Sequence, residues 1–303
     1  MYHKRLYYVP VDEKRVANRL RLLFDINAVH SFTPVMGGHM CRNFRVNTDK
    51  GIFFLKQYRN QISSVIHEIK NSESFFAQHE LPVIQPVRDK FSRTVFWLDG
   101  HWLSLFPFIT GTSPEFGKFS HTTVGALGYT LGRFHRAGAL ANYEYVQPLR
   151  LGDRSKFLME AIELQFELRS RPHPTILEGR IAQILEHKRK WVLSNRLPPR
   201  EIALPFDCLL HGDFIYPNVF VDEEGRITHV YDFEKTCQGP KAYEFARSLI
   251  INCFDDGWSE QNFSLAETFL RSYRDVQDLD STQLVKGIRM YAHDLMHMTW
   301  IAA

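Results

Sequence analysis

Cysteines are few in this sequence and no two of them form a CxxC pair. The 303 residues include four, Cys41, Cys208, Cys237 and Cys253, scattered along the chain. A metal site built from cysteines needs ligands at short, regular spacing, and disulfides belong to oxidising compartments. The pattern therefore predicts free thiols in a reducing cytoplasm.

Long apolar runs and an excess of one charge sign are also missing. No run approaches the roughly 18 residues of a membrane span, and residues 1–16 lack the apolar core and cleavage site of a signal peptide. The 37 Lys and Arg residues nearly balance 34 Asp and Glu. This balance gives no electrostatic reason to expect a nucleic acid or an anionic membrane as partner. We expect a cytoplasmic protein with neither.

The pattern of elements changes about one third of the way along the chain. Residues 12–27 have a helical period, and three strand-like segments follow between 31 and 58. Residues 61–78 are again helical, and Asp99-Gly100 marks the turn of a second hairpin. Beyond residue 110 helices predominate. The sequence therefore predicts an α+β fold with two lobes, a small β-rich N-lobe (1–109) and a larger, mostly helical C-lobe (110–303).

Three polar residues stand at a spacing that favours a shared site. Asp213 and Asn218 are five residues apart on one loop, and the apolar segments that follow predict a hairpin that brings Asp232 back near Asn218. One carboxylate is then available as a base, while an Asn–Asp pair offers oxygen ligands of the kind that Mg²⁺ prefers. The alternative is that all three only cap turns and strand ends.

The motifs His211-Gly-Asp-Phe-Ile-Tyr-Pro-Asn218 and Tyr231-Asp-Phe-Glu234 resemble those of the aminoglycoside phosphotransferase/choline kinase-like family, which has the protein-kinase-like fold. The resemblance implies that Asp213 is the catalytic base for a substrate hydroxyl. It implies that Asn218 and Asp232 hold Mg²⁺ on the phosphates of ATP, and that His211 is structural.

The same resemblance implies a phosphate-binding lysine on the third strand of the N-lobe. Lys56 occupies that place, and the preceding turn supplies Gly37 and Gly38, which allow the backbone to approach phosphates closely. The lysine needs a carboxylate on the following helix. The family pattern favours Glu68, whereas the helical period puts Glu73 on the apolar stripe; we prefer Glu68.

The segment 103–111, LSLFPFITG, resembles the strand and hinge that bind adenine in this family. Phe106 is expected at the back of the nucleotide pocket. Pro107 has no N–H group, but a hinge can use the Pro107 carbonyl and the Ile109 N–H.

Several other residues have two interpretations. His135, in a helix that resembles the family's, is predicted to be a packed core histidine. Glu244 stands where the family commonly has Asp, and its expected role is to fix the catalytic loop. His293 and His297 have the i, i+4 spacing of a zinc pair, but no HExxH motif accompanies them. The alternative is that His293 or Asp294 lines the acceptor pocket.

The resulting prediction is an ATP- and Mg²⁺-dependent kinase that phosphorylates a hydroxyl group of a small molecule. Amino alcohols, sugars, homoserine-like metabolites and aminoglycoside-type antibiotics all stay open as acceptors. A protein Ser/Thr kinase is disfavoured, because no APE-like activation segment follows Asp232. A catalytically silent nucleotide-binding protein of the same fold is the other alternative.

Overall fold

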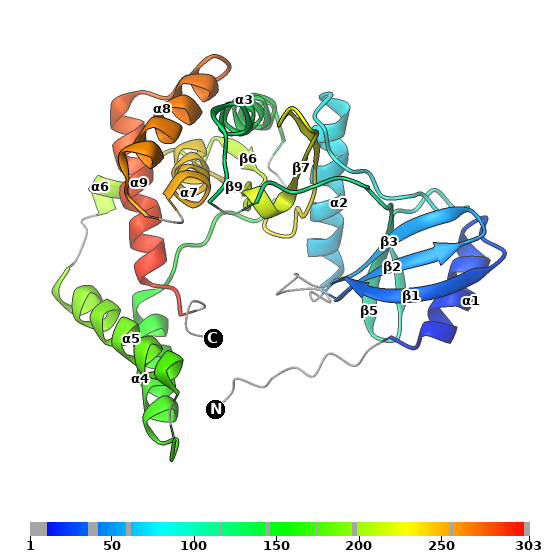
Figure 1. Cartoon of the computed structure of the whole chain (residues 1–303), viewed down its shortest axis with the longest axis horizontal. Coiled ribbons are helices and arrows are strands. Elements are labelled where there is room, and N and C mark those ends of the chain that lie inside the picture. The colour runs from blue at the N-terminus through cyan, green and yellow to red at the C-terminus, as the bar shows by residue number, and fades with distance from the viewer. Residues whose placement is uncertain are drawn as a thin grey trace.

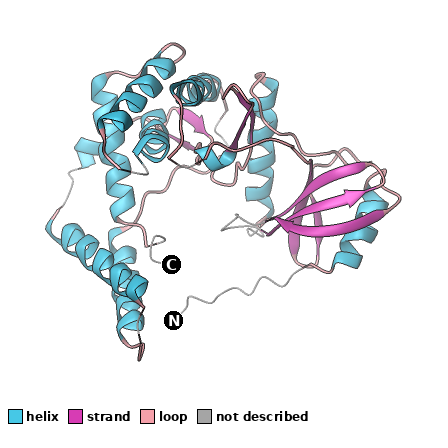
Figure 2. Cartoon of the chain, viewed as in Figure 1, coloured by secondary structure: helices cyan, strands magenta, loops and turns pink. Residues whose placement is uncertain are grey.

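The computed structural model describes residues 11–35, 42–58, 62–115, 117–142, 146–173, 175–195, 199–254 and 257–299. In these residues a five-stranded sheet with two helices forms one lobe, and a mostly helical lobe lies beside it (Figures 1 and 2). The predicted α+β fold with a small β-rich N-lobe is therefore confirmed. The division at residues 109 and 110 stays a prediction.

The N-lobe sheet is antiparallel throughout, with strand order β1-β2-β3-β5-β4. Its elements are α1 (Glu13–Leu23), β1 (Val29–Val35), β2 (Arg42–Thr48), β3 (Gly51–Gln57), α2 (Ser63–Gln78), β4 (Phe96–Leu98) and β5 (His101–Pro107). The β4–β5 turn follows the prediction, since Asp99 and Gly100 have φ angles of 51° and 80°. Two positive φ angles are what a tight type I′ turn requires.

Helix α1 covers one face of this sheet. Asp12 caps it by accepting the backbone N–H groups of Lys14 and Arg15. Its apolar stripe of Val16, Leu20 and Leu23 is buried against sheet residues that include Val46 and Leu55. These side chains form the core of the N-lobe, separate from the main core of the molecule.

Helix α2 packs instead against the C-lobe. Ile66, Ile69 and Phe76 are buried in the main core, where the Phe76 ring lies 4.8 Å from that of Phe134. Ile62, which the helical period places on the same stripe, is exposed because it is the residue before the first turn. The helix therefore connects the N-lobe sheet to the core of the C-lobe, and it lies between the two in Figure 1.

The C-lobe contains seven α-helices among the described residues, together with two short two-stranded sheets. Its elements are α3 (His121–Gly138), α4 (Arg154–Arg169), α5 (Ile176–Ser194), α6 (Pro199–Ile202), β6 (Cys208–Leu210), the 3₁₀ turn η1 (Tyr216–Asn218), β7 (Val219–Val221), β8 (Ile227–Val230), β9 (Cys237–Gly239), α7 (Lys241–Phe254), α8 (Glu260–Arg274) and α9 (Ser281–Met296). No helix in the part of the chain that the structure describes is long and apolar enough to cross a membrane.

Helices α3 and α8 pack closely because α3 carries glycine at the contact. A methyl group at Gly128 would overlap the backbone carbonyl of Phe269.

We expect Gly128→Ala to destabilise the protein by about 1–3 kcal/mol, because the backbone of α8 cannot move aside as a side chain can. Gly179→Ala is the matched control. That helical glycine has no neighbour within 4 Å, so the same change should stabilise by about 0.5–1 kcal/mol. Denaturant unfolding of both variants tests the pair, and a Gly128→Ala protein as stable as wild type would contradict the packing.

Candidate active site

The loop that follows β6 is held in shape by the buried side chain of His211. Its Nδ1 atom accepts the backbone N–H of Asp213 at 3.2 Å, so Nε2 carries the proton and donates it to the Tyr231 carbonyl at 3.0 Å. Gly212 has a φ angle of 84°, and any side chain there would overlap the Lys235 carbonyl. The loop therefore requires glycine beside Asp213, and His211 has the structural role that the sequence predicts.

Glu244 of α7 fixes the start of the same loop. Its carboxylate accepts the backbone N–H of His211 at 3.1 Å and that of Gly212, and it lies 3.0 Å from His135 Nε2. Burial alone would raise the pKa of Glu244, but the hydrogen bond and charge of His135 and the backbone donors lower it below its usual value. His135 is fully buried, with Nδ1 2.8 Å from the Tyr273 hydroxyl. Both residues have the roles expected of them.

The carboxylate of Asp213 is flanked by two cations. Lys235 Nζ donates to Oδ2 at 2.8 Å, and Arg247 Nη1 lies 2.5 Å from Oδ1. Burial would raise the pKa of Asp213, but Arg247 and then Lys235 bring it below its ordinary value. The group is therefore ionised at neutral pH.

The β7–β8 hairpin brings the chain at Asp232 back beside Asn218, the other predicted metal ligand. Val219 pairs with Val230, and the Tyr231 N–H donates to the Asn218 carbonyl at 3.1 Å. The Asn218 side-chain Nδ2 donates to the Asp213 carbonyl at 2.9 Å, and the predicted role of Asn218 as a metal ligand would therefore require its Oδ1. Asp232, the next residue after this contact, has a φ of 68°, a strained value for a residue other than glycine.

Lys56 joins the two lobes. It lies on β3, its side chain is only 6% exposed, and its Nζ is 2.8 Å from Asp232 Oδ1 and 2.7 Å from Glu234 Oε1. Burial opposes ionisation of Asp232, but Lys56 keeps the pKa of that carboxyl below its usual value. A lysine from the sheet thus meets two carboxylates from the segment after the hairpin, at the junction of the two lobes, where the sequence predicts the nucleotide.

Among the described ion pairs, the buried carboxylate of α2 is paired with a lysine of its own helix, not with Lys56. Glu73 is buried, and both its oxygens accept from Lys70 Nζ at 2.8 Å, whereas Glu68 is half-buried. Burial raises the pKa of Glu73 and lowers that of Lys70, each against the attraction of the other. Pairing of Glu68 with Lys56 stays a prediction, since the ion pairs described for Lys56 run to Asp232 and Glu234.

The predicted hinge residues lie at the end of β5 and just after it. Phe106 is buried, with the Lys70 ammonium 4.7 Å from its ring centre, so it stands beside the Lys70–Glu73 pair. Pro107 ends the strand and is exposed, and Ile109 is half-buried in the segment that leads to the C-lobe. Gly37 and Gly38 lie outside the described residues.

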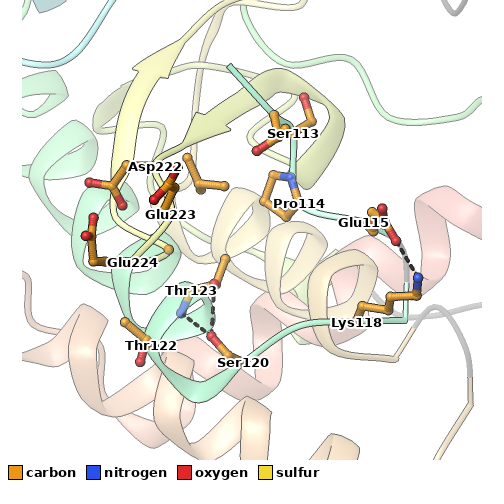
Figure 3. Close-up of a pocket in the computed structure, with 13 residues that line it drawn as sticks. Ser113, Pro114, Glu115, Lys118, Ser120, Thr122, Thr123, Asp222, Glu223 and Glu224 are labelled. Carbon is orange, nitrogen blue, oxygen red and sulfur yellow. Dashed lines mark hydrogen bonds and ion pairs between the residues drawn. The ribbon is translucent and has the colours of Figure 1, made fainter. Parts of the chain in front are cut away.

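A hollow that begins at Thr112 is a separate feature (Figure 3). It lies between residues 112–123 and the β7–β8 turn, with Asp222, Glu223 and Glu224 on one side and Glu115 on another. None of the predicted site residues is among the side chains that line it. Asp222 and Glu224 form ion pairs with Arg226, which fits the solvated turn that the sequence indicates there.

Sequence reasoning missed four charged residues that form ion pairs with the candidate residues: Glu234, Lys235, Arg247 and Lys70. Glu234 is the last residue of the second motif, Lys235 directly follows it, and Arg247 lies one helical turn after Glu244. These three therefore had a local signal in their positions, whereas Lys70 had none. By contrast, Asp294 is buried and accepts the Tyr243 hydroxyl at 2.5 Å and the Gly152 N–H at 2.6 Å, which is a structural role rather than a pocket lining.

Comparison with known proteins agrees with this geometry. The model of the phosphotransferase enzyme family matches residues 31–285. A homoserine kinase of Bradyrhizobium diazoefficiens is 24% identical over 267 residues, which cover 86% of this chain and 75% of that protein.

Solved structures have the same fold. A spectinomycin phosphotransferase in complex with ADP and spectinomycin superposes with a TM-score of 0.68 at 15% identity, covering 95% of this chain and 86% of that one. An amicoumacin kinase with AMP-PNP and Ca²⁺ gives 0.63 at 16% identity, covering 94% and 86%. The chain belongs to the phosphotransferase enzyme family, as its catalytic-loop motif implied, and is a small-molecule phosphotransferase with a kinase-like fold.

Proposed function

We propose that this enzyme transfers the γ-phosphoryl group of ATP to a hydroxyl group of a small molecule, with Asp213 as the base. The observation that carries the proposal is the meeting of Lys56, from the sheet, with Asp232, from the C-lobe, at 2.8 Å. A kinase binds the phosphates of a nucleoside triphosphate with a lysine and with a metal ion that a carboxylate holds, so the two groups must lie close together. Family membership and the nucleotide-bound relatives support it.

In the proposed reaction Asp213 accepts the proton of the acceptor hydroxyl. The hydroxyl oxygen forms a bond to the γ-phosphorus while the bond from that phosphorus to the ADP oxygen breaks. Asp213 is suited to orient the hydroxyl, since His211 fixes its backbone and its lowered pKa keeps it ionised. Most of the rate then comes from positioning and charge neutralisation.

The nucleotide would lie between the lobes. Lys56 exchanges its carboxylate partners for the phosphates, and Glu68 or Glu73 of α2 then takes over its ammonium group. Adenine would contact Phe106, the Pro107 carbonyl and the Ile109 N–H, and the phosphates would contact Gly37 and Gly38, as the sequence predicts.

The side chains at the end of the hairpin fit a magnesium ion. The Asn218 amide nitrogen is used by the Asp213 carbonyl, so Oδ1 is its available atom, and Asp232 adds a carboxylate that is one-third exposed. Two protein oxygens together with substrate phosphates are a usual Mg²⁺ ligand set. When bound, the ion would neutralise charge on the transferring phosphoryl group.

We expect Asp232→Asn to weaken Mg²⁺-dependent nucleotide binding by at least about tenfold, because a neutral amide replaces the only carboxylate of this ligand set. Asp222→Asn is the matched control, since that carboxylate lies on the β7–β8 turn. Titration with AMP-PNP, with and without Mg²⁺, measures both. Equal Mg²⁺-dependent affinity in wild type and Asp232→Asn would contradict the assignment.

The protein-kinase alternative is disfavoured by the segment after Asp232. Strand β9 and then α7, which begins at Lys241, follow almost directly, so the described chain has no room there for an activation segment. A small-molecule acceptor is therefore the function that we propose.

A further inference from the structure

The two cations on Asp213 differ in how they are held. Lys235 is half-exposed, at 49%, and lies three residues after Asp232 in the sequence. Arg247 is only 12% exposed and belongs to α7. Lys235 can move with its flexible side chain, whereas the Arg247 guanidinium is confined beside the base.

Arg247 is confined because α7 is packed tightly into the C-lobe. One turn before it, Tyr243 donates to Asp294 of α9 at 2.5 Å. A methyl group at Gly287 of α9 would overlap the Ala242 carbonyl of α7, so the two helices are in close backbone contact. Figure 1 shows α7 beside α9, away from the N-lobe sheet. The guanidinium is therefore a fixed part of the C-lobe wall next to the catalytic loop.

A buried guanidinium always carries its charge and requires an anion. Here the anion is Asp213, whose oxygen must also receive the acceptor hydroxyl if the proposed function holds. An acceptor with an anionic group could pair with the Arg247 guanidinium in place of this Asp213 oxygen. The oxygen would then be available to the acceptor hydroxyl. A carboxylate suits this exchange because its two oxygens match the planar fork of one arginine.

We infer that Arg247 is the anion anchor of the acceptor site and that the acceptor carries a carboxylate near its hydroxyl group. This inference rests on the proposed function. It disfavours polycationic acceptors such as aminoglycosides, because Arg247 and Lys235 would repel them beside the base. The acceptor class is then the hydroxy acids and the amino acids with a hydroxyl side chain.

Matched acceptors test the inference. L-Homoserine and 3-aminopropan-1-ol differ only in the carboxylate, and L-serine and ethanolamine differ in the same way; 4-hydroxybutanoate keeps the carboxylate but lacks the amine. For the best carboxylate-bearing acceptor, wild-type kcat/KM should exceed that of its decarboxylated partner by about 10- to 100-fold. Arg247→Met should abolish this preference, mainly by raising KM for the carboxylate-bearing acceptor.

Three variants separate anchoring from folding. Arg247→Lys keeps the positive charge but lacks the planar guanidinium. It should therefore keep part of the preference for the carboxylate-bearing acceptor that Arg247→Met loses. Lys235→Met should lower the turnover of the carboxylate-bearing acceptor and of its decarboxylated analogue by the same factor. Arg271→Met, on the exposed face of α8, should behave as wild type. Melting curves and AMP-PNP titration of each variant exclude unfolding as the cause.

Each outcome decides between the two proposals. Equal wild-type turnover of both partners, preference for a phosphate-bearing or cationic acceptor, or an unchanged ratio in Arg247→Met would overturn the inference while leaving the kinase function intact. Phosphoryl transfer to no acceptor of any class, with Mg²⁺-dependent nucleotide binding preserved, would overturn the proposed function itself.

Discussion

Replacing Asp213 with asparagine is expected to lower kcat by about 10²- to 10⁴-fold, the usual contribution of a positioned general base. The amide cannot accept the acceptor proton, but it fills the same space. Because Asp213 is not a proposed metal ligand, Mg²⁺-dependent binding of AMP-PNP should stay within a few-fold of wild type. A single-turnover assay for the phosphorylated product measures the chemical step directly.

The Asp213→Asn variant needs a control for the loss of its ion pairs. Arg247 and Lys235 both lose a charged partner, so the melting temperature is expected to fall. Asp275→Asn, an exposed carboxylate at the end of α8, makes the same chemical change away from the site. If Asp213→Asn turned over acceptor at a rate close to that of wild type or of Asp275→Asn, the role of base would be wrong.

The second large effect is on stability. Glu244→Ala should lower the free energy of unfolding by about 3–5 kcal/mol, because it leaves the His211 and Gly212 N–H groups and the His135 ring without their buried acceptor. Glu223→Ala, on the exposed β7–β8 turn, should change it by less than about 0.5 kcal/mol. Urea unfolding of the two variants gives the comparison.

The pH dependence of that loss has a definite sign. The pKa of Glu244 is lower in the folded protein than its ordinary value of 4.5, so its ionised form stabilises the fold. The difference between wild type and Glu244→Ala should be complete above about pH 4.5 and decrease as the pH falls below it. A difference of less than about 1 kcal/mol at neutral pH would contradict the role of Glu244.

Sequence reasoning succeeded where the information is local. The turn at Asp99-Gly100 depends on two residues, and the hairpin between Asn218 and Asp232 depends on two short apolar segments and the turn between them. Glu244 and His135 could be placed because each stands in a recognisable helix of the family pattern.

Sequence reasoning failed to predict which charged residues pair with each other in the folded protein. Helical period puts Glu73 on the buried face of α2, but it does not reveal that Lys70, three residues earlier, takes both of its oxygens. Arg247 likewise has a local position near Glu244, yet its contact with Asp213 exists only once α7 packs under the loop. Partners of buried charges are set by tertiary packing, which spacing alone does not encode.

The central claim is phosphoryl transfer from ATP to a small-molecule hydroxyl, and direct detection of the product tests it best. The enzyme would be incubated with ATP, Mg²⁺ and the matched acceptors, and the mixture followed by ³¹P NMR. We predict a phosphomonoester resonance that grows as ADP forms and that is lost with EDTA or with Asp213→Asn. Release of inorganic phosphate alone, or ester formation that is equally fast in Asp213→Asn, would contradict the account.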